Sequence, residues 1–106
     1  MGYEVTEDRK AKIIRYLDES GMKPRLKGYG LFITLISLSA DDPDLSCYEL
    51  FEVYAEKEFG VVINPKGNKK IWWSLYRDCQ YALGTSLSDK PVYDFIRSCA
   101  VHLEVD

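Results

Sequence analysis

The feature that most constrains the fold of this 106-residue chain is the regular placement of its helix-breaking residues. Most of them lie in four places, Gly21–Pro24, Asp41–Asp44, Asn64–Gly67 and Gly84–Pro91. Proline cannot continue a helix and glycine readily ends one, so each cluster marks a boundary. Between the clusters, apolar residues recur at spacings of three and four, which is typical of amphipathic helices. The pattern predicts an all-α fold, a compact bundle of about five helices forming a single domain over residues 1–106.

Capping signals define the ends of the expected helices. Thr6 is a candidate N-cap, and Gly21 is placed to end the first helix in the left-handed conformation. Ser46 and Glu49 form a capping box, and Gly60 closes the helix that this box begins. The helices are expected at Thr6–Glu19, Lys27–Ser39, Ser46–Phe59, Asn68–Leu83 and Val92–Leu103.

The segment Lys27–Ser39 is apolar on nearly every side, which predicts the central helix of the bundle. Within it, Leu31–Ile36 also has strand propensity, so a strand is the alternative there. In the next helix, the side chains expected to face inward are Leu50, Val53, Tyr54 and Phe59.

The sequence contains few arrangements of residues suited to catalysis or metal binding. Its three cysteines, Cys47, Cys79 and Cys99, show no CxxC spacing, and each lies in an apolar helical pattern that predicts a small buried side chain. His102 is the single histidine and is expected near a helix C-terminus, where it suits the dipole. There is no glycine-rich phosphate loop, paired-carboxylate arrangement or nucleophile–base set. We therefore expect that the protein is not an enzyme and that it has neither a metal site nor a cofactor.

No segment suggests export or membrane insertion. The first ten residues lack the apolar core of a signal peptide. The longest apolar stretch, Gly30–Ala40, is too short to cross a bilayer. We expect a cytoplasmic protein with no membrane partner.

The expected helix Asn68–Leu83 has two distinct faces. Its core face comprises Ile71, Leu75, Cys79 and Ala82, with Trp72 and Leu83 at the edge. Its opposite face carries Lys70, Trp73, Ser74 and Arg77. Residues 64–77 include three lysines and one arginine but no acidic residue. A basic helix start with polar groups on the exposed side is what a DNA-recognition helix requires, so we expect double-stranded DNA as partner.

The candidate DNA contacts divide by position. Lys66 and Lys69 lie at or before the helix start, where cations meet phosphates. Those on the outer face, where base edges would lie, are Lys70, Ser74 and Arg77. Trp73 lies among them and is suited to a thymine methyl group or a sugar.

The acidic residues set a condition on this interpretation. The net charge is −3, and Leu31–Gly60 alone holds seven acidic residues and one lysine. Phosphate neutralisation dominates DNA affinity. DNA binding therefore requires that these acids lie away from the surface that faces the duplex.

Three segments carry a resemblance to a known family. The first is Gly21–Phe32, in which glycine and proline precede the Lys27–Tyr29 run of lysine, glycine and tyrosine. The second is Leu50–Leu83, and the third is Lys90–Glu104 with its Phe-Ile pair. Together they resemble the C-terminal DNA-binding effector domain of the sporulation stage-zero response regulator, the master sporulation transcription factor of Firmicutes.

The resemblance implies a helix-turn-helix made of Ser46–Phe59 and Asn68–Leu83, with the second helix in the major groove. It implies sporulation-related transcription control and a homodimer formed through the last helix. The family's recognition helix would begin at Asn68, Lys69 and Lys70. Trp72 and Trp73 stand where the family has an acid and an arginine.

A second functional class stays open beside DNA binding. Trp72, Trp73 and Tyr76 could form an aromatic patch that binds another protein, because tryptophan and tyrosine are favoured anchors at interfaces. Core packing is the competing interpretation for Trp72. The alternative function is therefore a protein-interaction module on the same helical scaffold.

Overall fold

The fold is an all-α bundle, as the sequence predicts. The computed structural model describes residues 6–60, 69–86 and 89–105, and these contain no strand. The helices found there are α1 (Glu7–Glu19), α2 (Lys27–Asp41), α3 (Cys47–Phe59), α4 (Lys69–Gly84) and α5 (Val92–Val105). None of these helices is long and apolar enough to cross a membrane.

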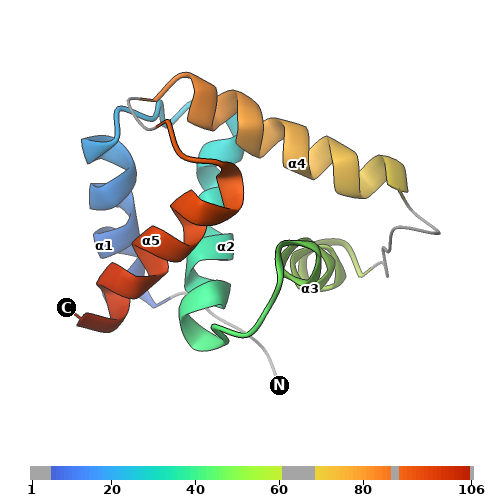
Figure 1. The fold of residues 1–106 in the computed structure, drawn as a ribbon, viewed down its shortest axis with the longest axis horizontal. Helices are drawn as coiled ribbons and strands as arrows, with labels where there is room; N and C mark the ends of the chain where they lie inside the picture. Colours follow the sequence, from blue (N-terminus) through green and yellow to red (C-terminus); the bar gives the residue numbers. More distant parts are fainter. Residues whose placement is uncertain (1–5, 61–68, 87–88, 106) are drawn as a thin grey trace.

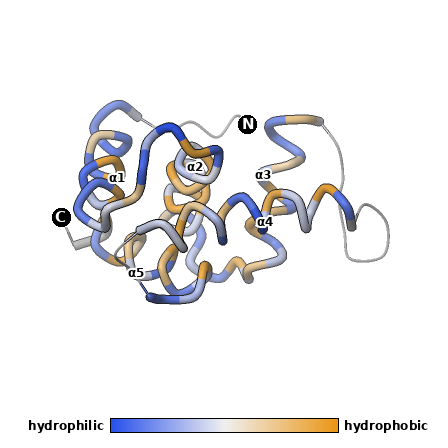
Figure 2. The backbone as a smooth tube through the Cα atoms, turned by 90° about the horizontal axis from the view of Figure 1, so that it is seen from above, coloured by the Kyte–Doolittle hydropathy of each residue, from blue (hydrophilic) through white to orange (hydrophobic). Residues whose placement is uncertain are grey.

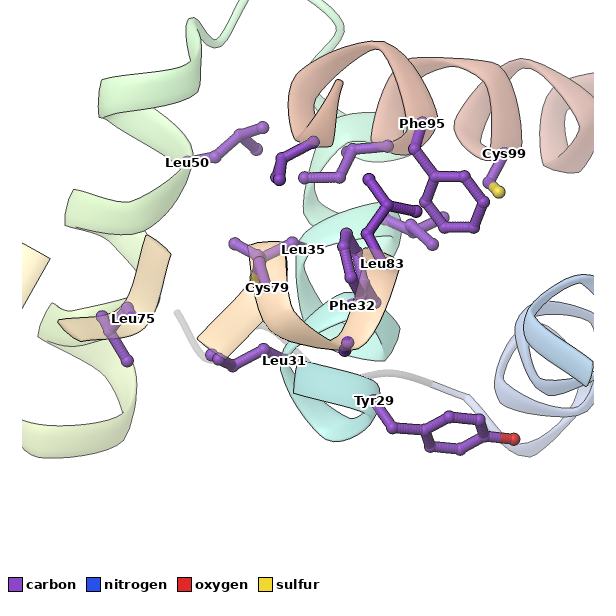
Figure 3. Packing of buried hydrophobic residues seen from close by; sticks show 14 of the residues in the cluster. Tyr29, Leu31, Phe32, Leu35, Leu50, Leu75, Cys79, Leu83, Phe95 and Cys99 are labelled. Carbon is purple, nitrogen blue, oxygen red and sulfur yellow. The ribbon is translucent and has the colours of Figure 1, made fainter. Parts of the chain in front are cut away.

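Helix α2 is the centre of the bundle, because all four other helices pack against it. Figure 1 shows α1 and α5 together on one side of the molecule, with α3 on the other side beneath α4. Hydrophobic colour runs along much of α2 in Figure 2, in keeping with its apolar sequence. Figure 3 shows the core that results, in which the rings of Phe32 and Phe95 meet edge to face with centroids 5.2 Å apart.

The local capping signals are confirmed. The Thr6 hydroxyl accepts a hydrogen bond from the Arg9 amide at 3.2 Å. Ser46 Oγ accepts from the Glu49 amide at 3.2 Å, and the Glu49 carboxylate accepts from the Ser46 amide at 2.9 Å. Gly21 and Gly60 have positive φ angles of 86° and 67°. Each signal acts within one helical turn, which is why the sequence reveals it.

Two expectations about α2 and α3 need correction. Leu31–Ile36 lies inside α2, so the strand alternative is wrong, and the helix continues to Asp41 rather than ending at Ser39. Phe59 does not face inward, since its side chain is 57% exposed. The buried side chains of α3, Leu50, Phe51 and Ala55, all precede it, so the last turn of α3 projects beyond the core. Val53 and Tyr54, also expected to face inward, are half-buried and pack against the core.

Gly28 brings α2 and α4 into unusually close contact. A Cβ atom at this position would lie 2.4 Å from the Asp78 carbonyl oxygen and 2.6 Å from the Ala82 Cβ. The glycine of the Lys27–Tyr29 run therefore has a packing role. The next residue, Tyr29, points from α2 toward α1 and donates a hydrogen bond to the Asp18 carboxylate at 2.9 Å (Figure 3). This pair of contacts fixes α2 against both neighbours.

Two arginines anchor the C-terminal half of α2. Arg97 of α5 donates to the Ser39 hydroxyl at 2.7 Å and to its carbonyl at 3.1 Å. Arg9 of α1 donates to Ser37 Oγ at 3.2 Å and forms an ion pair with Asp41 at 2.6 Å. The side chains of both serines are fully buried, so these bonds satisfy hydroxyls that have no access to water.

Candidate nucleic-acid interface on α4

Helix α4 presents the two faces that its sequence predicts. The buried side chains are Trp72, Leu75, Cys79, Ala82 and Leu83, and Ile71 is half-buried. The exposed side chains include Lys70, Trp73, Ser74 and Arg77. The structure therefore leaves the polar face of α4 accessible while its apolar face packs against α2 and the neighbouring helices.

The four exposed residues line a common surface hollow. Lys70, Trp73, Ser74 and Arg77 together surround an open depression of about 400 Å³. Their spacing of three, four and seven residues places them on consecutive turns of one helix face. No carboxylate from the described part of the chain lines this hollow. The surface therefore combines two cations, a hydroxyl and an indole.

Trp73 is held in place by two neighbouring aromatic side chains. Its ring meets that of Trp72 edge to face at 5.0 Å and that of Tyr76 at 5.8 Å, with interplanar angles of 80° and 88°. These edge-to-face contacts are favourable geometries for aromatic pairs. The side chain remains 46% exposed. Trp73 is thus an oriented apolar group within a polar surface.

Trp72 belongs to the core. It is 4% exposed and stacks between Tyr48 and Tyr76, at centroid distances of 4.6 and 5.1 Å. Its indole Nε1 is buried and has no hydrogen-bond partner among the residues that the structure describes. Because Trp72 is buried and Tyr76 is half-buried, Trp72, Trp73 and Tyr76 do not form a continuous exposed aromatic patch. Trp73 is the member of that trio that is accessible.

Part of the predicted set lies outside the residues that the structure describes. Lys66 and Asn68 belong to this group, as does the side chain of Lys69, whose backbone begins α4. Sequence reasoning missed Tyr81, which is 66% exposed and follows Arg77 by one turn. The same helical periodicity places Tyr81 on the outer face, so its exposure could be predicted from the sequence.

The acidic residues lie mainly on other elements. Helix α3 carries Glu49, Glu56 and Glu58 as exposed side chains, and Glu52 as a half-buried one. In α4, Asp78 is half-buried on the side that packs against Gly28. None of these described carboxylates lines the hollow on the outer face of α4.

The cysteines behave as small apolar side chains rather than as reactive groups. Cys79 and Cys99 are buried, as predicted, whereas Cys47 is half-buried. Burial raises the pKa of Cys99 to about 11 and raises the pKa of Cys79 as well. These thiols stay protonated near neutral pH, and a protonated thiol is a poor nucleophile. No group of three metal-ligating side chains occurs among the described residues.

No family model, no curated protein and no solved structure matches this chain. The functional argument therefore depends on the residues of the α4 surface themselves.

Proposed function

We propose that this protein binds double-stranded DNA and regulates transcription, with the exposed face of α4 in the major groove. The observation that carries this proposal is that Lys70, Trp73, Ser74 and Arg77 share one hollow free of described carboxylates. The two cations would neutralise phosphates or reach guanine, and the serine hydroxyl can donate to or accept from base edges. Trp73 would contact a thymine methyl group or a sugar.

The resemblance to the sporulation effector domain extends this proposal. In that arrangement, α3 and α4 form the helix-turn-helix, and α5 contacts a second copy on DNA. Phe95 and Ile96 are buried, so among the described side chains of α5 the large apolar one that is exposed is Val101, at 44%. The proposal places the protein in the cytoplasm as a sporulation-related regulator.

A salt titration of duplex binding tests the proposal directly. Binding should weaken as salt rises, because each neutralised phosphate releases counterions. Lys70→Ala should lower the slope of log K against log salt by about one unit. Replacing Lys66, Lys69 and Lys70 together should lower it further. Lys10→Ala, on the exposed surface of α1, is the matched control and should leave the slope unchanged.

Base recognition needs a separate measurement with a selected site and a random duplex. Arg77→Ala should cost about 1–3 kcal/mol on the selected site and relax the preference at one base pair. Absence of duplex binding at low salt would defeat the proposal, as would a slope unaffected by the triple lysine replacement. Either result would favour the protein-interaction module, in which Trp73→Ala removes partner binding and the lysine variants have little effect.

A further inference from the structure

A second hollow lies between the end of α3 and the first turns of α4. Phe59, Ile71 and Leu75 supply its apolar lining, and Lys70 and Ser74 border it on the α4 side. Its volume of about 550 Å³ is the size of cavities that take several apolar groups of a ligand. Figure 1 shows α3 and α4 meeting on the side of the molecule away from α1. This hollow is called the α3–α4 groove below.

Phe59 lines the groove with an apolar side chain that is exposed to water. Its side chain is 57% exposed, although its ring also meets that of Tyr54 edge to face at 6.1 Å. Covering the exposed part of this ring removes apolar surface from water, which favours binding. An exposed aromatic side chain beside an apolar hollow is the kind of surface at which proteins bind one another.

The acidic residues of α3 beside the groove favour a basic partner. Glu52 and Glu56 precede Phe59 by seven and three residues, so all three share one stripe of α3. Glu49 and Glu58 are two further acidic residues of α3. The one basic residue of this helix is Lys57. This side of the molecule repels phosphates and attracts cations. The opposite border is different, because Lys70 lies there on α4.

We propose that the α3–α4 groove binds an amphipathic helical segment of another protein, with apolar side chains inserted between Phe59 and Ile71. The lysines or arginines of that segment face Glu52 and Glu56. Helices docked in grooves present apolar anchors at positions i, i+3 or i+4, and i+7, which suits a hollow between two helices. Lys70 on the opposite border orients the segment, because its basic edge must turn toward α3. The groove shares Lys70 and Ser74 with the hollow proposed for DNA, but its apolar lining of Phe59, Ile71 and Leu75 is its own.

A designed peptide provides the probe. The peptide is a helix of about 18 residues, long enough to be partly ordered in water, with leucines along one stripe and lysines along one edge. Two matched peptides carry alanine in place of leucine or glutamate in place of lysine. Titration into isotope-labelled protein should shift the amide signals of Phe59, Ile71 and Leu75. Phe59→Ala should weaken binding by about tenfold, whereas Lys10→Ala, on the exposed surface of α1, should not change it.

The charge requirement is tested with Glu52→Gln and Glu56→Gln together, a surface change that preserves the core. These substitutions should lower the affinity for the lysine peptide several-fold and reduce the salt dependence of its binding. The proposal is overturned if the glutamate peptide binds equally well, if Phe59→Ala has no effect, or if the shifts map to Trp73 and Arg77 instead of Phe59, Ile71 and Leu75. A concentration-dependent dimer that Phe59→Ala abolishes would identify a second copy as occupant and also overturn it. Duplex DNA binding measured on Phe59→Ala should be unchanged, which separates this test from that of the proposed function.

Discussion

Replacing Gly28 with alanine tests whether the close approach of α2 and α4 is required for stability. The new Cβ would lie 2.4 Å from the Asp78 carbonyl oxygen and 2.6 Å from the Ala82 Cβ. Carbon atoms in ordinary contact are about 3.5–4.0 Å apart, so the helices must separate by about 1 Å. Neither contact can be relieved by a side-chain rotation, because one partner is backbone and the other is a Cβ. The strain therefore falls on the whole interface.

Two opposing effects determine the magnitude. Alanine favours helix over glycine by about 1 kcal/mol at most, which would stabilise the variant. Overpacking of a tight core costs about 1–3 kcal/mol and sometimes more. Here the clash involves backbone, and its relief loosens the packing of Leu75, Cys79 and Leu83, so the cost belongs at the upper end of that range. We expect a net loss of about 2 kcal/mol, and a fall in Tm of about 10 °C.

The chain offers a matched control two residues away. Gly30 lies in the same helix, is exposed, and has no atom within 4 Å of a Cβ built there. Gly30→Ala should therefore stabilise the protein by about 0.5–1 kcal/mol through helix propensity alone. Urea unfolding followed by far-ultraviolet circular dichroism measures both variants. The reasoning fails if Gly28→Ala is as stable as the wild type, or if both variants shift in the same direction.

Three further changes probe other contacts. Arg97→Met should cost about 1–3 kcal/mol of unfolding free energy, because it leaves the buried Ser39 hydroxyl unpaired, and a double-mutant cycle with Ser39→Ala should show coupling. Burial and the Asp18 carboxylate raise the pKa of Tyr29 from 10.0 to about 12. The fold therefore favours the protonated phenol, so the stability that Tyr29 contributes is fully present below pH 10 and is lost as the pH rises to about 12. A difference in unfolding free energy between wild type and Tyr29→Phe that stays constant between pH 10 and about 12 would contradict this. Ser46→Ala should reduce the unfolding free energy by about 1 kcal/mol through loss of the capping box, and an unchanged urea midpoint would count against the role of the cap.

The sequence by itself determined the features that act within a helical turn. Thr6, Ser46 and Gly60 define helix ends through contacts with residues three or four positions away, so their roles are visible in the chain. The two faces of α4 follow from periodicity in the same way, and the placement of Lys70 and Arg77 on one exposed face agrees with it. The exposure of Tyr81 follows from the same periodicity, because it lies four residues after Arg77.

The tertiary structure alone decided how the helices meet. The burial of Trp72 between two tyrosines depends on α3 packing beside α4, and the bond from Arg97 to Ser39 joins residues 58 positions apart. Phe59 has the same helical spacing as buried residues of α3, yet it lies past the end of the core. Such contacts depend on crossing angles and on where each helix ends relative to its neighbours. These quantities arise from the packing of all the side chains together, so no local pattern in the sequence expresses them.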